Sequence, residues 1–215
     1  MNARAWKGIV GAFVGVMLMV PSLAMAQGKG EAVRLTPKSA ELRLALRDLW
    51  GDHIFWVRNV VVTTKLQEKE AAKAAEEQVV QNAKNIAAAV VPYYGKDAGD
   101  KLFTLLAGHY GAIKEYMNAA FSANKSGMDA AQGKMLKNAD EIATFLSGAN
   151  PNWPKQALLS ALSAHGAFHM AQIMQTNAKD FSAEAKTWES MKTQVLQIAD
   201  VLAEGIVKQF PQRFE

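Results

Sequence analysis

ALLSALSAHGAFHMAQIM, residues 157–174, contains no charged side chain but carries two histidines, His165 and His169. Such a stretch is typical of a helix buried among other helices, because alanine and leucine favour helix and a buried helix needs no polar face. His53, His109 and His165 are evenly spaced in the sequence, 56 positions apart. The chain is therefore predicted to be built from three repeats.

The period of 56 positions extends beyond the histidines, to places that are apolar or carry a carboxamide in all three repeats. Residues that coincide after the shift include Leu46, Leu102 and Leu158; Ile86, Ile142 and Ile198; Ala87, Ala143 and Ala199; and Asn82, Asn138 and Gln194. A period of this length indicates a supersecondary unit that cannot bury its apolar face alone. Residues 123–126 and 179–182 align with 67–70, so each unit is expected to turn there and form a hairpin.

The composition predicts an all-α fold, specifically a six-helix bundle made of three helical-hairpin repeats with this period of 56. Helix-forming residues are abundant, and apolar residues recur at intervals of three and four. One domain is expected over residues 27–215, with hairpins at about 36–91, 97–147 and 153–210. Starts of helices are marked at Thr36, Asp97, Ser126 and Ser182, and by the break over residues 150–154.

Residues 1–26 are typical of an export signal. Arg4 and Lys7 precede an uncharged apolar run over residues 8–20, and Ala24-Met25-Ala26 follows it. We expect cleavage before Gln27 and a periplasmic or secreted protein. The run is shorter than the roughly 20 residues of a membrane span, so no transmembrane segment is expected after cleavage. An uncleaved anchor is the alternative.

The charge and cysteine content exclude several classes of protein. Net charge is +4, and it falls to +2 without residues 1–26, which carry two basic side chains and no acidic one. The remaining charges are mixed, as in residues 65–77, rather than gathered in a basic stripe, so nucleic-acid binding is not expected. The absence of cysteine excludes disulfides, thiolate metal sites and covalent haem attachment.

Each repeat is expected to place a histidine opposite a carboxamide. The midpoints between His53 and Asn82, between His109 and Asn138, and between His165 and Gln194 all fall within the expected turns. In an antiparallel hairpin, residues equally far from the turn lie at the same level. A polar pair is therefore expected to enter the core three times.

A closed arrangement of the hairpins would bring the three histidines together. Neutral imidazoles at one level could bind zinc, copper or nickel, with an open position for water or substrate. His169, four residues after His165 on the same helical face, could complete the site. The carboxamides of Asn82, Asn138 and Gln194, and the carboxylate of Asp52, are candidate partners that would orient the rings. Hairpins stacked in a row would instead keep the histidines about 10 Å or more apart.

Other interpretations stay open at this point. The histidine and carboxamide pairs could be purely structural, in a non-enzymatic envelope scaffold whose partner contacts residues 210–214. An enzyme would require an open cavity at the level of the histidines. Met170 and Met174 suit copper(I) but are more often core residues. The acidic residues Asp140, Glu141, Asp200 and Glu204 lack the ExxH spacing of a di-metal site and are interpreted as surface groups.

Three segments resemble an uncharacterised family of exported bacterial all-helical proteins. The resemblance rests on LWGDHIFWVR (residues 49–58), NADEIATFL (residues 138–146) and QFPQRF (residues 209–214), and it covers most of the mature chain. It implies the helical fold and export, with no activity to carry over. Members of that family tend to have an acidic residue directly before each of the three histidines. Asp52 keeps this feature, whereas Gly108 and Ala164 occupy the other two positions.

Overall fold

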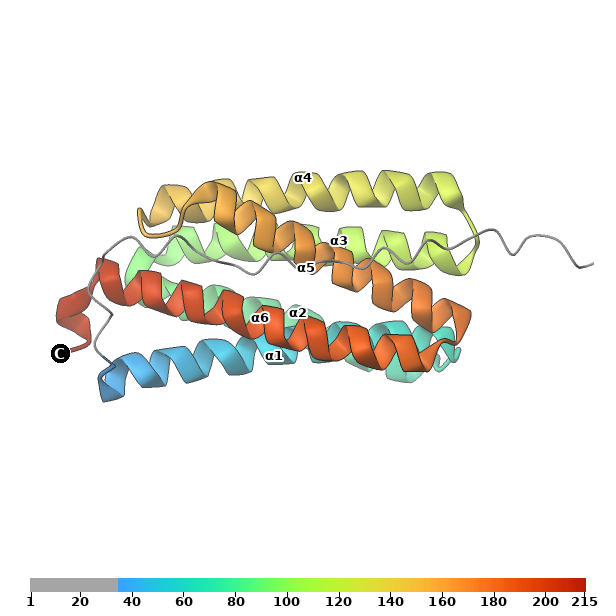
Figure 1. Ribbon diagram of the computed structural model, residues 1–215, viewed down its shortest axis with the longest axis horizontal. Coiled ribbons are helices and arrows are strands. Elements are labelled where there is room, and N and C mark those ends of the chain that lie inside the picture. Colours follow the sequence, from blue (N-terminus) through green and yellow to red (C-terminus); the bar gives the residue numbers. More distant parts are fainter. Residues whose placement is uncertain (1–34) are drawn as a thin grey trace, which may run out of the picture.

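The computed structural model describes residues 35–215, so the export signal predicted over residues 1–26 lies outside the described residues. Within that range, the chain forms six α-helices, a short 3₁₀ turn and no strand, which confirms the all-helical prediction (Figure 1). The elements are α1 (Pro37–Lys65), α2 (Lys69–Tyr94), α3 (Lys96–Phe121), α4 (Lys125–Ala149), α5 (Lys155–Ala178), α6 (Phe181–Gln209) and η1 (Pro211–Arg213).

Helix α1 begins where the sequence predicts it. Thr36 is the N-cap, and it exchanges hydrogen bonds with Ser39: each backbone N–H donates to the other residue's hydroxyl, at 2.9 and 3.2 Å. Pro37 occupies the first helical position, where its missing N–H costs nothing because that group has no partner within the helix.

Helices α4 and α6 begin slightly earlier than expected. Their N-caps are Asn124 and Asp180, rather than Ser126 and Ser182. The side-chain oxygen of each cap accepts a hydrogen bond from the backbone N–H three residues later, at 3.0 Å. Asparagine and aspartate cap helices about as well as serine, so the first suitable residue after the turn takes this role.

Three turns at one end of the bundle share one backbone conformation. Gln67, Ala123 and Lys179 have left-handed φ angles of 62°, 55° and 60°. In each turn the next N–H donates to a carbonyl five residues earlier, at 2.8 to 3.0 Å, which closes the end of the helix in the Schellman manner. The turns therefore lie where the midpoints of the polar pairs predict them.

Helix α2 runs three residues beyond its expected end. Pro92 lies inside its last turn, and the helix stops only at Gly95, whose φ is 83°. Glycine adopts this conformation without the steric cost that a side chain imposes. The proline is tolerated because it replaces one helical N–H close to the end of the helix, and Gly95, rather than Pro92, makes the turn into α3.

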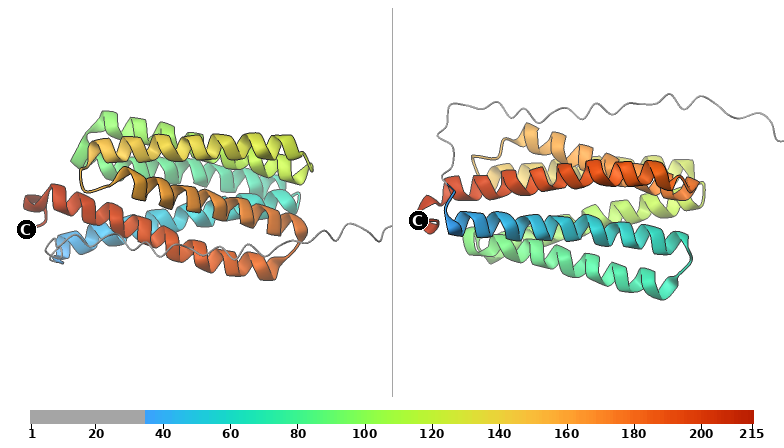
Figure 2. Two further views of the ribbon diagram at one scale, coloured as in Figure 1. Left: turned by 45° about the horizontal axis from the view of Figure 1, so that its top comes forward. Right: turned by 60° about the horizontal axis from the view of Figure 1, so that its bottom comes forward.

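The helices form a closed bundle. Each packs against the next along the chain, and α6 packs against α1, which completes the ring. Helix α5 also contacts both α1 and α3 across the middle. Figures 1 and 2 show the six helices side by side along the long axis, with the α1–α2, α3–α4 and α5–α6 turns at one end. A stacked row of hairpins is therefore excluded.

The described part of the chain has two apolar clusters, and the histidines lie between them. One cluster contains Leu46 and Trp50, which precede His53, and the residues at matching places on α3 and α5. The other contains Val57 and Val60, which follow His53, together with Ile113 and Ile173. The histidines are thus the polar layer at the middle of a long apolar core.

The C-terminal segment packs on its own bundle. Phe214 is buried, its ring stacks on Tyr93 with centroids 5.9 Å apart, and its carbonyl accepts a hydrogen bond of 2.7 Å from the Thr36 hydroxyl. Phe210 and Phe214 therefore pack on the end of the bundle, whereas residues 211–213 between them are exposed. Across residues 35–215, none of the helices is long and apolar enough to cross a membrane.

Candidate metal centre

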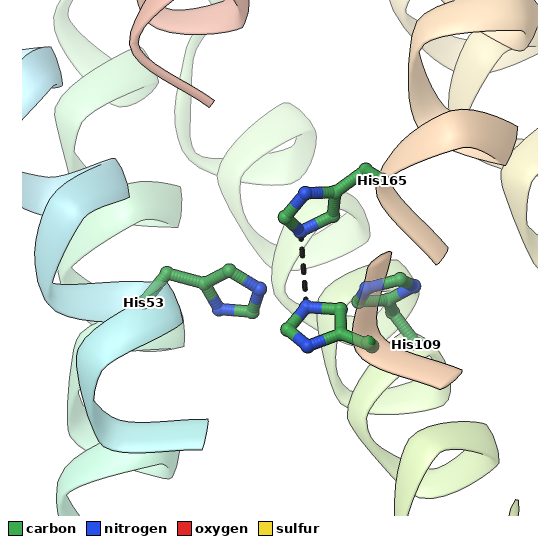
Figure 3. Close-up of side chains that lie close together, drawn as sticks. His53, His109 and His165 are labelled. Carbon is green, nitrogen blue, oxygen red and sulfur yellow. Dashed lines mark hydrogen bonds between the residues drawn. The ribbon is translucent and has the colours of Figure 1, made fainter. Parts of the chain in front are cut away.

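His53 on α1, His109 on α3 and His165 on α5 meet in the middle of the bundle (Figure 3). Their ring centroids lie 5.9 Å apart for His53 and His109, 5.5 Å for His53 and His165, and 5.8 Å for His109 and His165. At most 6% of the surface of any of them is exposed. Their convergence, which the sequence left dependent on a closed bundle, is confirmed.

His169 joins the cluster from one helical turn further along α5. Its side chain points back toward the start of the helix, as helical side chains do, so its ring reaches the level of His165. The Nε2 atoms of His165 and His169 are 3.1 Å apart, and a hydrogen bond between them requires one ring to donate and the other to accept. One nitrogen from each of the four histidines falls in a group whose members all lie within 4.8 Å of one another.

The four imidazoles are neutral at physiological pH. Burial lowers the pKa of His53 to about 3, with a further contribution from His109, and lowers that of His109 to about 4. The pKa values of His165 and His169 also lie well below the ordinary value, first because of burial and then because neighbouring histidines disfavour a second positive charge. Neutral imidazole is the form that binds a metal ion.

Several ring nitrogens in the cluster are buried and make no hydrogen bond. Nε2 of His53, both nitrogens of His109 and Nδ1 of His165 have no partner among residues 35–215. A buried polar atom without a partner costs about 1–3 kcal/mol. These nitrogens are available to bind a ligand.

The carboxamides lie beside the histidines but bond to the backbone. Asn82, Asn138 and Gln194 each donate through their NH₂ group to a carbonyl 33 residues earlier, at 2.9, 3.0 and 2.8 Å. The accepting carbonyls belong to Leu49, Leu105 and Ala161, each four residues before a histidine. The expected pairing at one level is therefore present, although these bonds hold the helices together and do not satisfy the rings.

The carboxamide oxygens remain free to accept a hydrogen bond. Among the described residues, those of Asn82, Asn138 and Gln194 are buried without a partner. The carboxamides of Asn138 and Gln194 lie close enough to His109 and His165 to raise the pKa of those rings against the larger effect of burial. A ring that binds an ion through Nε2 has an Nδ1–H to donate, and a carboxamide oxygen is a suitable acceptor for it.

Two of the glycines beside the histidines permit close helix packing. A Cβ atom on Gly108 would lie 3.2 Å from Nδ2 of Asn138, and one on Gly166 would lie 2.7 Å from Sδ of Met135. The small residues that the sequence places around the histidines thus allow α4 to approach both α3 and α5. Gly51 and Gly111 have no neighbour within 4 Å of such an atom.

The remaining candidates lie away from the cluster. Asp52 is exposed, because its neighbour His53 points inward and successive helical residues are about 100° apart around the axis. Met174 is also exposed, whereas Met170 packs against one apolar cluster. The four acidic residues form surface ion pairs, as expected: Asp140 with Lys155, Glu141 with Lys137, Asp200 with Arg43 and Arg47, and Glu204 with Lys208.

An ion pair between the buried Glu184, near the start of α6, and the partly exposed Arg58 was not foreseen. Both carboxylate oxygens of Glu184 accept hydrogen bonds of 2.7 Å from Arg58, and Oε1 also accepts one of 2.9 Å from Gln172. Glu184 is 3% exposed, and its carboxylate raises the pKa of Arg58. Gln172 follows His169 by three residues on α5, so this pair joins α1, α5 and α6 close to the histidines. Arg58 and Glu184 are 126 residues apart, and no sequence pattern links them.

An apolar cavity adjoins the histidine cluster. His53, His109 and His165 form part of its wall, and twelve leucine, isoleucine, valine and tryptophan side chains form the rest. Its volume is about 30 Å³. The histidines therefore face a small space in which they are the principal polar groups.

Comparison of the chain with models of protein families, with curated proteins and with solved structures gives no match.

Proposed function

We propose that this protein is exported and binds a transition-metal ion through His53, His109, His165 and His169. The observation that carries the proposal is that these four buried, neutral imidazoles each place a candidate ligand atom within 4.8 Å of the others. Surface histidines gather by chance, but four in one buried layer require a reason, because burial removes their hydration.

The spacing of the ring nitrogens suits an ion of the size of zinc. Zinc binds histidine nitrogen at 2.0–2.1 Å, so tetrahedral ligands lie about 3.3 Å from one another. Nε2 of His165 and Nε2 of His169 are already 3.1 Å apart. The candidate ligand atoms of all four rings lie within 4.8 Å of one another, so the other rings must move closer together to bind one ion. Two histidines four residues apart on one helix form a familiar metal-binding pair.

Zinc, copper and nickel fit this set of ligands best. Imidazole suits all three metals, whereas magnesium and calcium prefer oxygen ligands. The group of candidate ligands found in residues 35–215 consists of histidines alone, with no carboxylate to balance the charge of the ion. This composition favours copper in its singly charged state over a doubly charged ion, because less charge is buried without compensation.

We further propose that the three hairpins are repeats with a period of 56 positions. Three observations at the proposed interval support this: the histidines that meet in the core, the carboxamide bonds that each span 33 residues, and the left-handed residues Gln67, Ala123 and Lys179. The proposed repeats differ at one position of the site. Val57 and Ile113 occupy the places that correspond to His169, so the fourth ligand belongs to the third hairpin alone.

Metal analysis of protein purified without a histidine tag tests the function directly. We expect one equivalent of zinc, copper or nickel per chain, and a loss of at least 100-fold in affinity in His109→Ala. Asp52→Asn is the matched control, because it lies next to a ligand in sequence but is exposed, and it should keep the metal. A saturating ion should also stabilise the fold, by about 2.7 kcal/mol at 100 times its Kd. Absence of metal from wild-type protein supplied with all three ions would overturn the proposal.

Export has a separate test. Expression of the full chain, with residues 1–26 included, should yield protein outside the cytoplasm, with Gln27 as its first residue. Retention in the cytoplasm, or a protein that keeps residues 1–26, would contradict export without affecting the metal site.

A further inference from the structure

The apolar cavity lies on one particular side of the proposed metal ion. Its wall includes Trp50, Leu106 and Leu162, each three residues before a histidine. At 1.5 Å per residue, this places the cavity about 4.5 Å toward the beginnings of α1, α3 and α5. The backbone of His169 lies four residues in the other direction, and its ring, which reaches back to the level of His165, is not part of the cavity wall as the described residues define it. The ion would therefore have His169 on one side and the cavity on the other.

The size of the cavity restricts what it can hold. A volume of about 30 Å³ is about one fifth of that of an engineered apolar cavity that admits benzene, about 150 Å³. A molecule of two heavy atoms therefore fits more readily than one of the size of benzene.

The chemistry of the wall restricts the ligand further. Apart from the histidines, the wall consists of leucine, isoleucine, valine and tryptophan. Small apolar cavities of this kind stay dry and accept uncharged molecules such as xenon. The indole N–H of Trp153 donates to the carbonyl of Val201, whereas that of Trp50 is buried with no partner within residues 35–215. A charged ligand would find too few hydrogen-bond donors here to replace its hydration.

We propose that the cavity admits a neutral diatomic molecule, such as dioxygen, nitric oxide or carbon monoxide, which approaches the metal ion on the side opposite His169 and replaces that imidazole as the fourth ligand. This inference rests on the proposed metal site. It goes further by naming the class of ligand, the side from which that ligand approaches and the residues that limit its size.

Xenon tests the cavity without any metal. We expect crystals of the metal-free protein, pressurised with xenon, to show one xenon atom beside Leu106. Leu106→Trp should abolish the xenon site by filling the cavity, and a tryptophan is already present at the corresponding position 50. Leu136→Trp is the control: Leu136 is 48% exposed, so the same substitution there should leave the xenon site intact. If Leu106→Trp fails to fold, Leu162→Phe serves the same purpose.

Carbon monoxide tests the ligand on the metal. We expect copper(I)-loaded wild-type protein to bind carbon monoxide, with a C–O stretching band that Leu106→Trp or Leu162→Phe removes and Leu136→Trp retains. The bulkier ligand tert-butyl isocyanide also binds copper(I) through carbon. The wild-type protein should bind it at least 100-fold more weakly than it binds carbon monoxide, and this comparison needs no variant.

The outcomes separate this inference from the proposed function. If the protein binds no metal, the proposed function is overturned, and so is the proposal that a ligand binds to the metal. The xenon experiment would still test whether the cavity admits a small apolar atom. If copper binds but xenon does not, or if the isocyanide binds as well as carbon monoxide, the metal site stands and the size-restricted ligand is overturned. Preferential binding of the anion azide to copper(II)-loaded protein, unaffected by Leu106→Trp, would likewise overturn it.

Discussion

Gly205 shows how closely single residues are fitted around the end of the cavity. It lies on α6 directly against the indole of Trp153, so any Cβ atom there would overlap the ring. Trp153 is 2% exposed, and its N–H is held by the carbonyl of Val201. An alanine at position 205 would therefore force the indole to give up this hydrogen bond or the helix to shift.

Gly205→Ala should destabilise the protein by about 3 kcal/mol, because the ring or the helix must move in a packed core. Gly133→Ala is the matched control. Gly133 is exposed in the interior of α4, with nothing within 4 Å of an added Cβ, so alanine there should stabilise the helix by about 1 kcal/mol. Urea unfolding of the two variants measures both values, and equal effects would show that Trp153 is not a rigid neighbour.

The turn between α3 and α4 contains a residue in an unfavourable backbone conformation. Ala123 adopts a left-handed conformation in the α3–α4 turn, which is unfavourable by about 1–2 kcal/mol for a residue with a side chain. It is also exposed, so its methyl group contributes little packing. Neither Gln67 nor Lys179, in the two similar turns, is glycine.

Ala123→Gly should therefore stabilise the protein by about 1 kcal/mol and raise its Tm by a few degrees. Ala130→Gly tests the opposite case seven residues later. Ala130 is exposed within α4, and glycine in a helix interior costs about 1 kcal/mol. Thermal unfolding of the pair should show shifts of opposite sign, and a fall in Tm in both would mean that the turn is not strained.

The sequence predicted the elements well because their signals are local. The intervals between the histidines and the carboxamides located the turns, and the spacing of four located His169 on the face of His165. The sequence also predicted that the carboxamides lie at the level of the histidines. It did not predict their hydrogen-bond partners, because a carboxamide can donate to a backbone carbonyl or to an imidazole equally well. The Arg58–Glu184 pair and the cavity depend on contacts between helices that are far apart in the sequence. The sequence of any one helix therefore does not predict them.

At the scale of the whole molecule, the buried histidines make stability depend on pH. In the metal-free protein, the folded-state pKa values lie below the ordinary value of about 6.5, at about 3 for His53 and about 4 for His109. Below pH 6.5 the histidines therefore bind protons in the unfolded chain but stay neutral in the folded chain. Stability is greatest above that pH and is lost as the pH falls.

We expect a loss of about 2 kcal/mol per histidine between pH 7 and pH 5, and of several kcal/mol for the four together. His169→Val isolates the effect, since valine occupies the corresponding position 57 and one titrating group is removed. Denaturant unfolding at a series of pH values should show a shallower decline in this variant than in the wild type. Parallel curves would indicate that His169 is not buried in its neutral form.

The packing of α6 against α1 has a consequence for how the chain can be rearranged. The hydroxyl of Thr36 donates to the carbonyl of Phe214, so the two ends of the described chain lie side by side. Circular permutants that join them through a short glycine linker and open the chain at Gly95 or Pro151 should refold around the same four imidazoles, because neither break crosses a helix. In such permutants a different hairpin comes first in the sequence, whereas each hairpin keeps the same neighbours in the ring.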